Sequence, residues 1–370
     1  MKILLLGEFS GFYLNLKQGL LELGAEVTLA ANGDGWKQIP GADMPLYRTG
    51  DTQKVKKIYY KLIKPLLERK KLQGYDVVQL VHENIYRPYI NSHMIKELKR
   101  QNGSLYVNVA GNCYSLYKSW RDGKLGYYTF DNNPDKCEMY TGGGLRRVMT
   151  RRTEEYTDRI ADGIIPVMYE YAVGVRELPN CKKTIPLPFN SGKIEYRTNR
   201  PDGKLVFYHG ILREKDKGTD YIRQAFEIVQ KKYPNDVEMI ICGNLPFQEY
   251  LEVLRRTNIL VDQCKEHCWG MNACYGMAQG KVVLGGASRN SLKEFGLEKS
   301  PVIHIRPDVR QIVHQIEYVL ENRNRIEEWG YESRQFVETF HDCKKIAQQY
   351  LDVWKQDQHK VKETSYDTGK

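Results

Sequence analysis

A basic pair, Arg213 and Lys217, stands in a glycine-containing segment whose chemistry suits the binding of phosphate groups. An arginine can grip a phosphate with two hydrogen-bond donors and a lysine adds a point charge, so the pair could hold a diphosphate. Glu214 and Asp216 lie in the same turn and could instead neutralise both cations. The segment therefore predicts either a phosphate site or an ordinary solvated turn.

The loop between Gly7 and Gly11, directly after an apolar opening run, is a second place where a phosphate could bind. Glycines let the backbone approach a ligand closely, and the amides that open a following helix would face it. The spacing is not the Gly-x-Gly-x-x-Gly fingerprint, and no acidic residue ends the next apolar run at 27–30. A nicotinamide enzyme is thus disfavoured, and the glycines could equally serve only a tight turn.

Three cysteines and a histidine gather between residues 264 and 274, a composition that raises the question of a metal. Cys264, His267, Cys268 and Cys274 lack the two separated ligand pairs of common structural zinc sites. We therefore expect free thiols and no metal.

Polar residues also follow apolar runs in the first half of the chain. His82 and Glu83 follow the run 77–81, and Asn112 follows another. Side chains at the end of a strand can bind a ligand, although a histidine there can also be a structural hydrogen bonder. The long aromatic stretch 112–145 could be functional or could act as a packing flap.

Two series of short apolar runs alternate with helical segments, as a parallel sheet covered by helices requires. The first series lies at 3–6, 26–30, 76–80, 104–109 and 163–166. The second lies at 204–208, 237–242, 259–262, 282–286 and 302–305. A stiff proline-containing segment at 185–188 separates them. The pattern predicts an α/β protein of two βα domains with a boundary near residue 190.

The most specific motifs lie in the second series. Their residues are Gly210-x2-Arg213-x3-Lys217-Gly218-Thr219, Asp262-Gln263, Trp269-Gly270 and Met277-Ala278-x-Gly280-Lys281-x-Val283. This pattern resembles the donor-binding half of the family-4 glycosyltransferases, which have the GT-B fold. The resemblance covers roughly residues 204–345, whereas the first half matches in its βα rhythm and first glycine loop.

The resemblance implies a fold, a reaction and a set of roles. Two Rossmann-like domains would face a central cleft, and a C-terminal helix around 346–354 would cross back to the first domain. A hexose would leave a nucleoside diphosphate with retained configuration and without a metal. Arg213 and Lys217 would be catalytic by stabilising the leaving diphosphate, and His82 or Glu83 would serve the acceptor side.

The resemblance also implies donor-binding positions, two of which depart from the family pattern. The donor-binding candidates are Gly11, Gly210, Gly218, Gly243, Glu266, Gly270, Met271, Asn272 and Tyr275. Tyr275 stands where a ribose-binding Glu is usual, and His267 stands where many members have a second Glu. Glu266, one residue earlier, could substitute in a shifted loop. These departures keep open a GT-B scaffold or binding subunit without catalysis.

The charge of the chain favours polyanionic partners, because 56 Lys and Arg residues against 46 Asp and Glu give a formal charge of +10. Residues 53–72 predict a basic amphipathic helix whose cations include Lys56, Lys57, Lys61 and Lys64. It could be a solvated face or could hold the protein against anionic lipid. Nucleic acid is not an expected partner. We expect a cytoplasmic protein, peripheral on the inner face of a membrane.

The sequence therefore predicts a hexosyltransferase of surface polysaccharide biosynthesis. Its nucleotide-sugar donor would be a substrate, with no other cofactor, and its acceptor a glycan or a lipid-linked glycan. A GT-B epimerase or phosphorylase is a weaker alternative. The expected parts are an acceptor-binding domain at 1–190, a donor-binding domain at 191–345, a crossover helix at 346–358 and a disordered tail at 359–370.

Overall fold

The computed structural model describes most of the chain. The described residues are 1–34, 39–46, 56, 58–211, 213–243, 245 and 247–367. The chain divides into two compact units, each assembled from more than one segment. Unit 1 comprises Met1–Arg121, Glu138–Pro188 and Cys343–Lys370, and unit 2 comprises Asp122–Cys137 and Phe189–Asp342.

Unit 1 is built on a six-stranded sheet in the order β3-β2-β1-β4-β5-β6, with all neighbours parallel. The strands are β1 (Lys2–Leu6), β2 (Glu26–Ala31), β3 (Met44–Pro45), β4 (Val77–Leu80), β5 (Ser104–Val109) and β6 (Gly163–Pro166). The structure confirms the first series of predicted strands and adds the short edge strand β3. The central strands are buried almost throughout, as expected for a parallel sheet covered on both faces.

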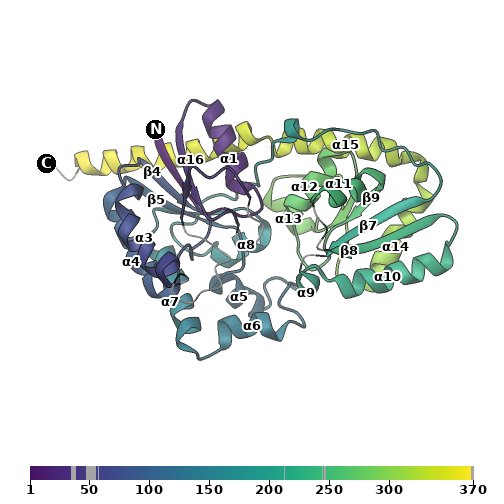
Figure 1. The fold of residues 1–370 in the computed structure, drawn as a ribbon, viewed down its shortest axis with the longest axis horizontal. Coiled ribbons are helices and arrows are strands. Elements are labelled where there is room, and N and C mark those ends of the chain that lie inside the picture. Colours follow the sequence, from purple (N-terminus) through teal and green to yellow (C-terminus); the bar gives the residue numbers. More distant parts are fainter. Residues whose placement is uncertain are drawn as a thin grey trace. The chain divides into compact units, whose positions relative to one another are not determined.

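Helices connect the strands of unit 1 (Figure 1). They are α1 (Phe12–Glu22), α3 (Lys64–Glu68), α4 (Pro88–Gln101), α5 (Tyr114–Arg121), α7 (Leu145–Ile160) and α8 (Tyr169–Val175). Helix α6 (Pro134–Thr141) begins in unit 2 and ends in unit 1. A π-helical turn at Tyr59–Ile63 and a 3₁₀ turn at Arg69–Leu72 flank α3.

The last helix, α16 (Cys343–Asp367), belongs to unit 1 and packs along α1 (Figure 1). Trp354 is fully buried, and its indole Nε1 donates a hydrogen bond to Gln79 Oε1 at 3.1 Å. The helix was expected at 346–358, with a disordered tail at 359–370. It instead continues to Asp367, since each residue added to a formed helix gains a backbone hydrogen bond.

Unit 2 contains a five-stranded parallel sheet in the order β11-β10-β9-β7-β8. The strands are β7 (Leu205–Ile211), β8 (Val237–Gly243), β9 (Ile259–Val261), β10 (Val282–Gly285) and β11 (Ile303–His304). The helices are α9 (Glu214–Lys217), α10 (Thr219–Lys232), α11 (Phe247–Arg256), α12 (Met271–Ala278), α13 (Arg289–Glu294), α14 (Val309–Glu321) and α15 (Ile326–Phe340). The structure confirms the second series of predicted strands, whose apolar side chains form one core with those of α10 and α14.

The strand order of each sheet reverses once, between β1 and β4 in unit 1 and between β7 and β9 in unit 2. Open α/β sheets bind ligands outside the carboxyl ends of the strands at such a switch point. The Gly7–Gly11 loop follows β1, and His82 follows β4. Arg213 and Lys217 follow β7, and Asp262 follows β9. These residues therefore follow the two strands that flank the switch point of each sheet.

Candidate functional site

A left-handed turn at Gly218 positions the basic segment of unit 2. Gly218 has φ +74° and joins the end of α9 to the start of α10. A Cβ atom there would lie 2.4 Å from Cys264 Sγ, so only glycine suits both the backbone and the packing. Lys217 is then directed inward, with its side chain 8% exposed, whereas Arg213 opens α9 with its side chain 69% exposed.

Lys217 forms a buried ion pair with Asp262, in which Nζ lies 2.9 Å from Oδ1. The Asn272 side chain donates a second hydrogen bond to the same oxygen at 2.7 Å. Burial by itself raises the pKa of Asp262, but the Lys217 charge and these hydrogen bonds outweigh it, so the net pKa lies below its usual value. Lys217 is therefore placed at the switch point as a cation that already shares its charge with a carboxylate.

His209, which the sequence analysis did not single out, ties β7 to β9 and α10. Its Nδ1 donates to the carbonyl oxygen of Val261 at 2.8 Å, and its Nε2 accepts from the Thr219 hydroxyl at 2.9 Å. Burial and the nearby Lys217 lower the pKa of His209 to about 4, so the ring is neutral, as this bonding pattern requires. The imidazole thus fixes the strand ends that carry Lys217 and Asp262.

Helix α12 begins at Met271 with Gly270 as its N-cap. Gly270 has no side chain with which to cap the first turn. The Asn272 side chain is engaged elsewhere, because its Nδ2 donates to Asp262 and its Oδ1 accepts from the Tyr250 hydroxyl at 3.1 Å. A phosphate at this helix end would therefore be bound by the backbone amides of Gly270, Met271 and Asn272.

Tyr275 and Glu266 lie in different surroundings within unit 2. The half-buried ring of Tyr275 meets Phe189 edge-on, with 4.9 Å between centroids. Burial raises the pKa of Glu266, whereas the charges of Arg213 and Lys136 act in the opposite direction. The structure thus brings Glu266 into the electrostatic surroundings of Arg213.

His267 anchors the Asp122–Cys137 segment to the rest of unit 2. Its ring is buried and stacks on Tyr127 at a centroid distance of 4.3 Å. Nε2 donates to the carbonyl oxygens of Leu125 (3.0 Å) and Tyr127 (3.1 Å), and Nδ1 accepts from the Ser288 hydroxyl (3.1 Å). A glutamate at this position would turn carboxylate oxygens toward two carbonyl oxygens, so the departure from the family pattern has a structural reason.

The remaining glycine candidates of unit 2, Gly210 and Gly243, lie at the carboxyl ends of the neighbouring strands β7 and β8. Gly243 is paired with Ile211, and Gly210 with Cys242. Both glycines therefore stand at the sheet edge from which the basic segment departs.

The loop between Gly7 and Gly11 in unit 1 holds an internal carboxylate, Glu8. Glu8 is 3% exposed, and its Oε2 accepts the backbone N–H of Leu14 in the first turn of α1 at 2.9 Å. Burial raises the pKa of Glu8 to about 7. Gly11, with φ +85°, makes the turn into α1. An anion bound at the start of α1 would lie close to the carboxyl group of Glu8. The sequence analysis gave this acidic residue of the loop no role.

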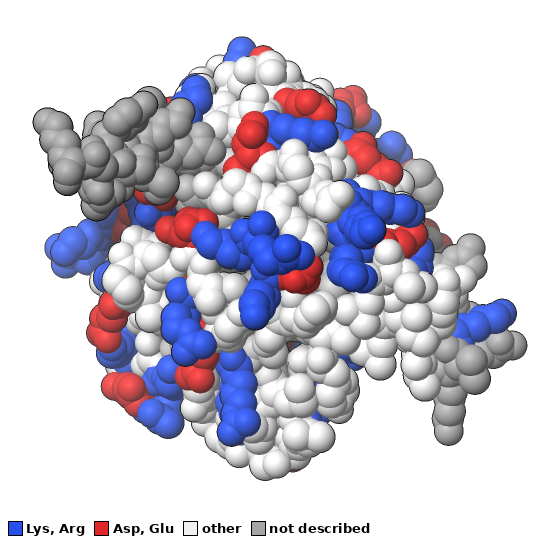
Figure 2. Space-filling view, turned by 90° about the vertical axis from the view of Figure 1, so that its left-hand side faces the viewer, with Lys and Arg blue, Asp and Glu red and all other residues white. Residues whose placement is uncertain are grey.

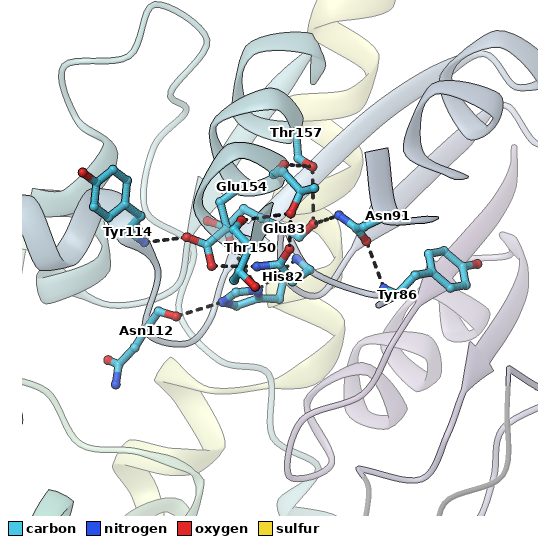
Figure 3. A network of polar contacts seen from close by, with 11 residues as sticks. His82, Glu83, Tyr86, Asn91, Asn112, Tyr114, Thr150, Glu154 and Thr157 are labelled. Carbon is cyan, nitrogen blue, oxygen red and sulfur yellow. Dashed lines mark hydrogen bonds and ion pairs between the residues drawn. The ribbon is translucent and has the colours of Figure 1, made fainter. Parts of the chain in front are cut away.

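A polar network surrounds His82 at the carboxyl end of β4 (Figure 3). Nδ1 accepts the N–H of Asn84 at 3.1 Å and Nε2 donates to the carbonyl oxygen of Asn112 at 3.2 Å, a pattern of the neutral ring. Burial lowers the pKa of His82 accordingly. The Asn84 amide donates to Glu154 Oε1 at 2.6 Å, and Glu154 Oε2 accepts the N–H of Tyr114 at 2.8 Å. Helix α7 thus orients His82 through Asn84.

Three buried carboxyl groups lie in the same part of unit 1: Glu83, Glu154 and Asp158. Burial raises the pKa of Glu83 to about 7, and burial together with the Glu83 charge raises that of Glu154 to about 8 and that of Asp158 well above its usual value. Glu83 is 0% exposed, although its Oε2 lies 3.1 Å from His82 Nδ1. Glu83 therefore has no surface on which to meet an acceptor, and it could act only through His82.

The aromatic stretch 112–145 is divided between the units. Tyr114, Tyr117 and Tyr140 stack on one another in unit 1, with 5.1 Å between the centroids of Tyr117 and Tyr140. The Asp122–Cys137 segment belongs to unit 2. The stretch thus contains a packed aromatic stack and a separate segment that contacts the basic region of unit 2.

Comparisons with known proteins identify the fold. No family model matches the chain, and a search of curated proteins finds no match. Among solved structures, sucrose-phosphate synthase from Thermosynechococcus elongatus aligns over 96% of this chain and 99% of its own, with a TM-score of 0.61 and 15% identity.

Two further structures align over 96% of this chain and all of their own. HepE from Anabaena in complex with UDP-glucose has a TM-score of 0.61 and 12% identity. UDP-GlcNAc 2-epimerase from Neisseria meningitidis bound to UDP-GlcNAc has a TM-score of 0.54 and 11% identity. The chain therefore has the GT-B fold of two Rossmann-like domains that the sequence resemblance implies.

Proposed function

We propose that this protein is a retaining, metal-independent glycosyltransferase of the family-4 type. It transfers a hexose from a nucleoside diphosphate to a glycan or a lipid-linked acceptor in surface polysaccharide biosynthesis. The observation that carries the proposal is the group of cations and helix amides at the switch point of unit 2, contributed by Arg213, Lys217 and the start of α12. Proteins of the same fold bind UDP-glucose and UDP-GlcNAc, which supports UDP as the first nucleotide to try.

Arg213 and Lys217 have different roles in binding the donor. Arg213 is exposed and can offer two donors to the leaving diphosphate, which develops charge as the glycosidic bond breaks. Lys217 adds a fixed positive charge, reduced by its pairing with Asp262. The departing phosphate can take the proton of the acceptor hydroxyl, so retention needs no strong base. His82 then orients the acceptor in unit 1.

Titration of UDP, GDP, ADP and their sugars into the full chain tests the proposal. We expect one nucleotide to bind and Arg213→Ala to weaken it about tenfold, the scale of one lost charge-assisted hydrogen bond. Arg200→Ala is the matched control, because Arg200 is exposed in the same unit and pairs with Glu327 at 3.0 Å. Its affinity should match the wild type. Wild-type affinity in Arg213→Ala would refute the proposal.

A second candidate function is a GT-B scaffold or binding subunit. Tyr275 in place of a ribose-binding carboxylate and the structural use of His267 favour it. Such a protein would bind a nucleotide sugar without hydrolysis or transfer to any offered glycan. Product analysis also separates transfer from epimerisation, the reaction named for one protein of the same fold.

We further propose that the segment around α3 contacts an anionic membrane surface. Residues 53–55 and Lys57 of the predicted basic helix lie outside the described residues. In the described part of this segment, the exposed apolar side chains are those of Ile58, Tyr59, Ile63 and Leu67. The neighbouring lysines are Lys56, Lys61, Lys64, Lys70 and Lys71. Seen from this side of the molecule, Lys and Arg gather in patches with fewer acidic side chains among them (Figure 2).

Vesicle flotation tests the membrane contact. Among the described residues, no helix combines the length and apolar character that crossing a bilayer needs. A surface contact would instead insert apolar side chains while lysines meet anionic headgroups. We expect flotation with acidic but not neutral vesicles, and its loss in Leu67→Glu. Leu21→Glu, at an exposed leucine of α1, is the control. Equal flotation of both variants would contradict the proposal.

A further inference from the structure

The Asp122–Cys137 segment is fastened to unit 2 close to the basic turn that follows β7. The buried Lys265 donates from Nζ to the carbonyl oxygen of Asp131 at 2.8 Å, and His267 holds the start of the segment as described above. At its other end the segment carries Lys136, whose side chain is only 13% exposed. A residue from the first half of the chain is thereby built into the donor-binding unit.

Lys136 neutralises Asp216, one of the two acidic residues of the basic turn. Nζ of Lys136 lies 2.8 Å from Oδ1 of Asp216 and donates to the Thr129 hydroxyl at 2.9 Å. The Asn133 amide donates to the same Asp216 oxygen at 3.2 Å. Since both partners are largely buried, at 13% and 18% exposure, this pair is less screened by solvent than a surface pair.

Asp216 is also an acid that can compete for Arg213. It stands three residues after Arg213 on the same short helix, and its Oδ2 lies 3.9 Å from Arg213 Nη1, beyond hydrogen-bond distance. The other acid of the turn, Glu214, makes its close ion pair with Arg223 at 2.8 Å. The sequence alone left open whether these acids neutralise the basic pair. In the structure, the closest basic partner of each acid lies outside that pair, namely Lys136 for Asp216 and Arg223 for Glu214.

We propose that Lys136 is a positioning residue for Arg213: by holding Asp216, it keeps that carboxylate at 3.9 Å and prevents it from forming a charge-assisted hydrogen bond with the guanidinium that binds the donor diphosphate. The role rests on the proposed function. Without Lys136, a shift of about 1 Å brings Asp216 into a charge-assisted hydrogen bond with Arg213. A diphosphate would then have to displace a carboxylate from the guanidinium before binding.

Four variants of the full chain test the role, with UDP and inorganic pyrophosphate as probes in calorimetric titrations. Lys136→Met should weaken both probes about tenfold, which is one broken charge-assisted hydrogen bond. Asp216→Asn should bind as well as the wild type or better. The double variant Lys136→Met with Asp216→Asn should return to within about threefold of wild type, since residue 216 then has no carboxylate with which to capture Arg213.

The control is Lys215→Met, which removes another cation that joins the same segment to the same turn. Lys215 pairs with Asp135 at 3.0 Å, but both side chains are well exposed, at 59% and 81%. Its affinity for the probes should equal that of the wild type. If the ion pairs served only to hold the segment against unit 2, Lys215→Met and Lys136→Met would both weaken probe binding and would differ only in degree. Adding Asp216→Asn to Lys136→Met would then restore no affinity.

The outcomes separate this role from the proposed function. Wild-type affinity in Lys136→Met, or equal weakness in the single and double variants, overturns the role while nucleotide binding by the wild type stands. A wild-type protein that binds neither UDP, GDP, ADP nor pyrophosphate overturns the proposed function and the role together. Thermal melting of each variant shows whether unit 2 remains folded.

Discussion

Replacing Lys217 by methionine removes the positive partner of a buried carboxylate while keeping most of the side-chain volume. The side chains of Lys217 and Asp262 are 8% and 2% exposed, and their charged atoms are 2.9 Å apart. Breaking a buried ion pair from one side costs about 3–5 kcal/mol, because the remaining charge is poorly solvated. At roughly 2–4 °C per kcal/mol for a domain of 150–250 residues, the melting temperature of unit 2 should fall by about 10 °C at pH 8.

The loss of stability in Lys217→Met should depend on pH. In the wild type the pKa of Asp262 lies below its usual value. Without Lys217, burial becomes the dominant influence and raises this pKa above that of the unfolded chain. A carboxyl group whose pKa is higher in the folded state loses stability as the pH rises from the unfolded pKa to the folded one. The variant should therefore lie closer to wild type at pH 5 than at pH 8.

Differential scanning calorimetry at the two pH values measures the effect. The double variant Lys217→Met with Asp262→Asn should recover most of the lost stability, because Asn272 can still donate to the amide oxygen. Lys232→Met is the control, since Lys232 forms a surface pair with Glu317 at 2.7 Å and such pairs are worth about 0–1 kcal/mol. A melting temperature of Lys217→Met within about 2 °C of wild type at pH 8 would refute the reasoning. So would a double variant as unstable as the single one.

Two further predictions concern the buried side chains of Glu83 and His267. The pKa of Glu83 rises from its usual 4.5 to about 7 in the folded protein, so this group lowers stability as the pH increases across that interval. Glu83→Gln should raise the free energy of unfolding at pH 8 by up to about 3 kcal/mol, and with it the melting temperature, and change little at pH 4. Glu97→Gln is the control, because the partly exposed Glu97 side chain forms an ion pair with the exposed Arg100 at 2.8 Å. His267→Phe should leave two carbonyl oxygens unpaired, which costs about 1–3 kcal/mol. Hydrogen exchange should then accelerate over residues 122–137 and stay unchanged in β4, and uniform acceleration would contradict an anchoring role.

The sheet cores were predictable because central parallel strands are buried on both faces and therefore appear as uninterrupted apolar runs. Strand β3 escaped prediction since two residues at a sheet edge, Met44 and Pro45, leave no such pattern. The basic turn was also predictable, because Arg213 and Lys217 follow a strand and a helix begins directly after Gly218.

The partners of these residues could not be predicted from local patterns. Lys136 lies 80 positions before Asp216 in the chain, and neither spacing nor periodicity links them. His267 was noted only as standing where many members of the resembled family have a second Glu, whereas its ring binds the backbone of a segment 140 residues away. Glu8 was passed over although an acid inside a glycine loop was itself a signal. In each case a contact between distant segments decided the role of the side chain.

Unit 1 takes its core from both ends of the sequence, which constrains the order in which the protein can be made. Tyr350 accepts a hydrogen bond from Asn108 at 2.8 Å, and Trp354 donates one to Gln79. Two buried polar side chains of the sheet therefore form hydrogen bonds with residues of α16. During synthesis on the ribosome, all six strands of this sheet emerge early, but the core of unit 1 remains incomplete until the residues of α16 have emerged. All segments of unit 2 are synthesised before α16, so unit 2 can fold while the core of unit 1 still lacks this helix.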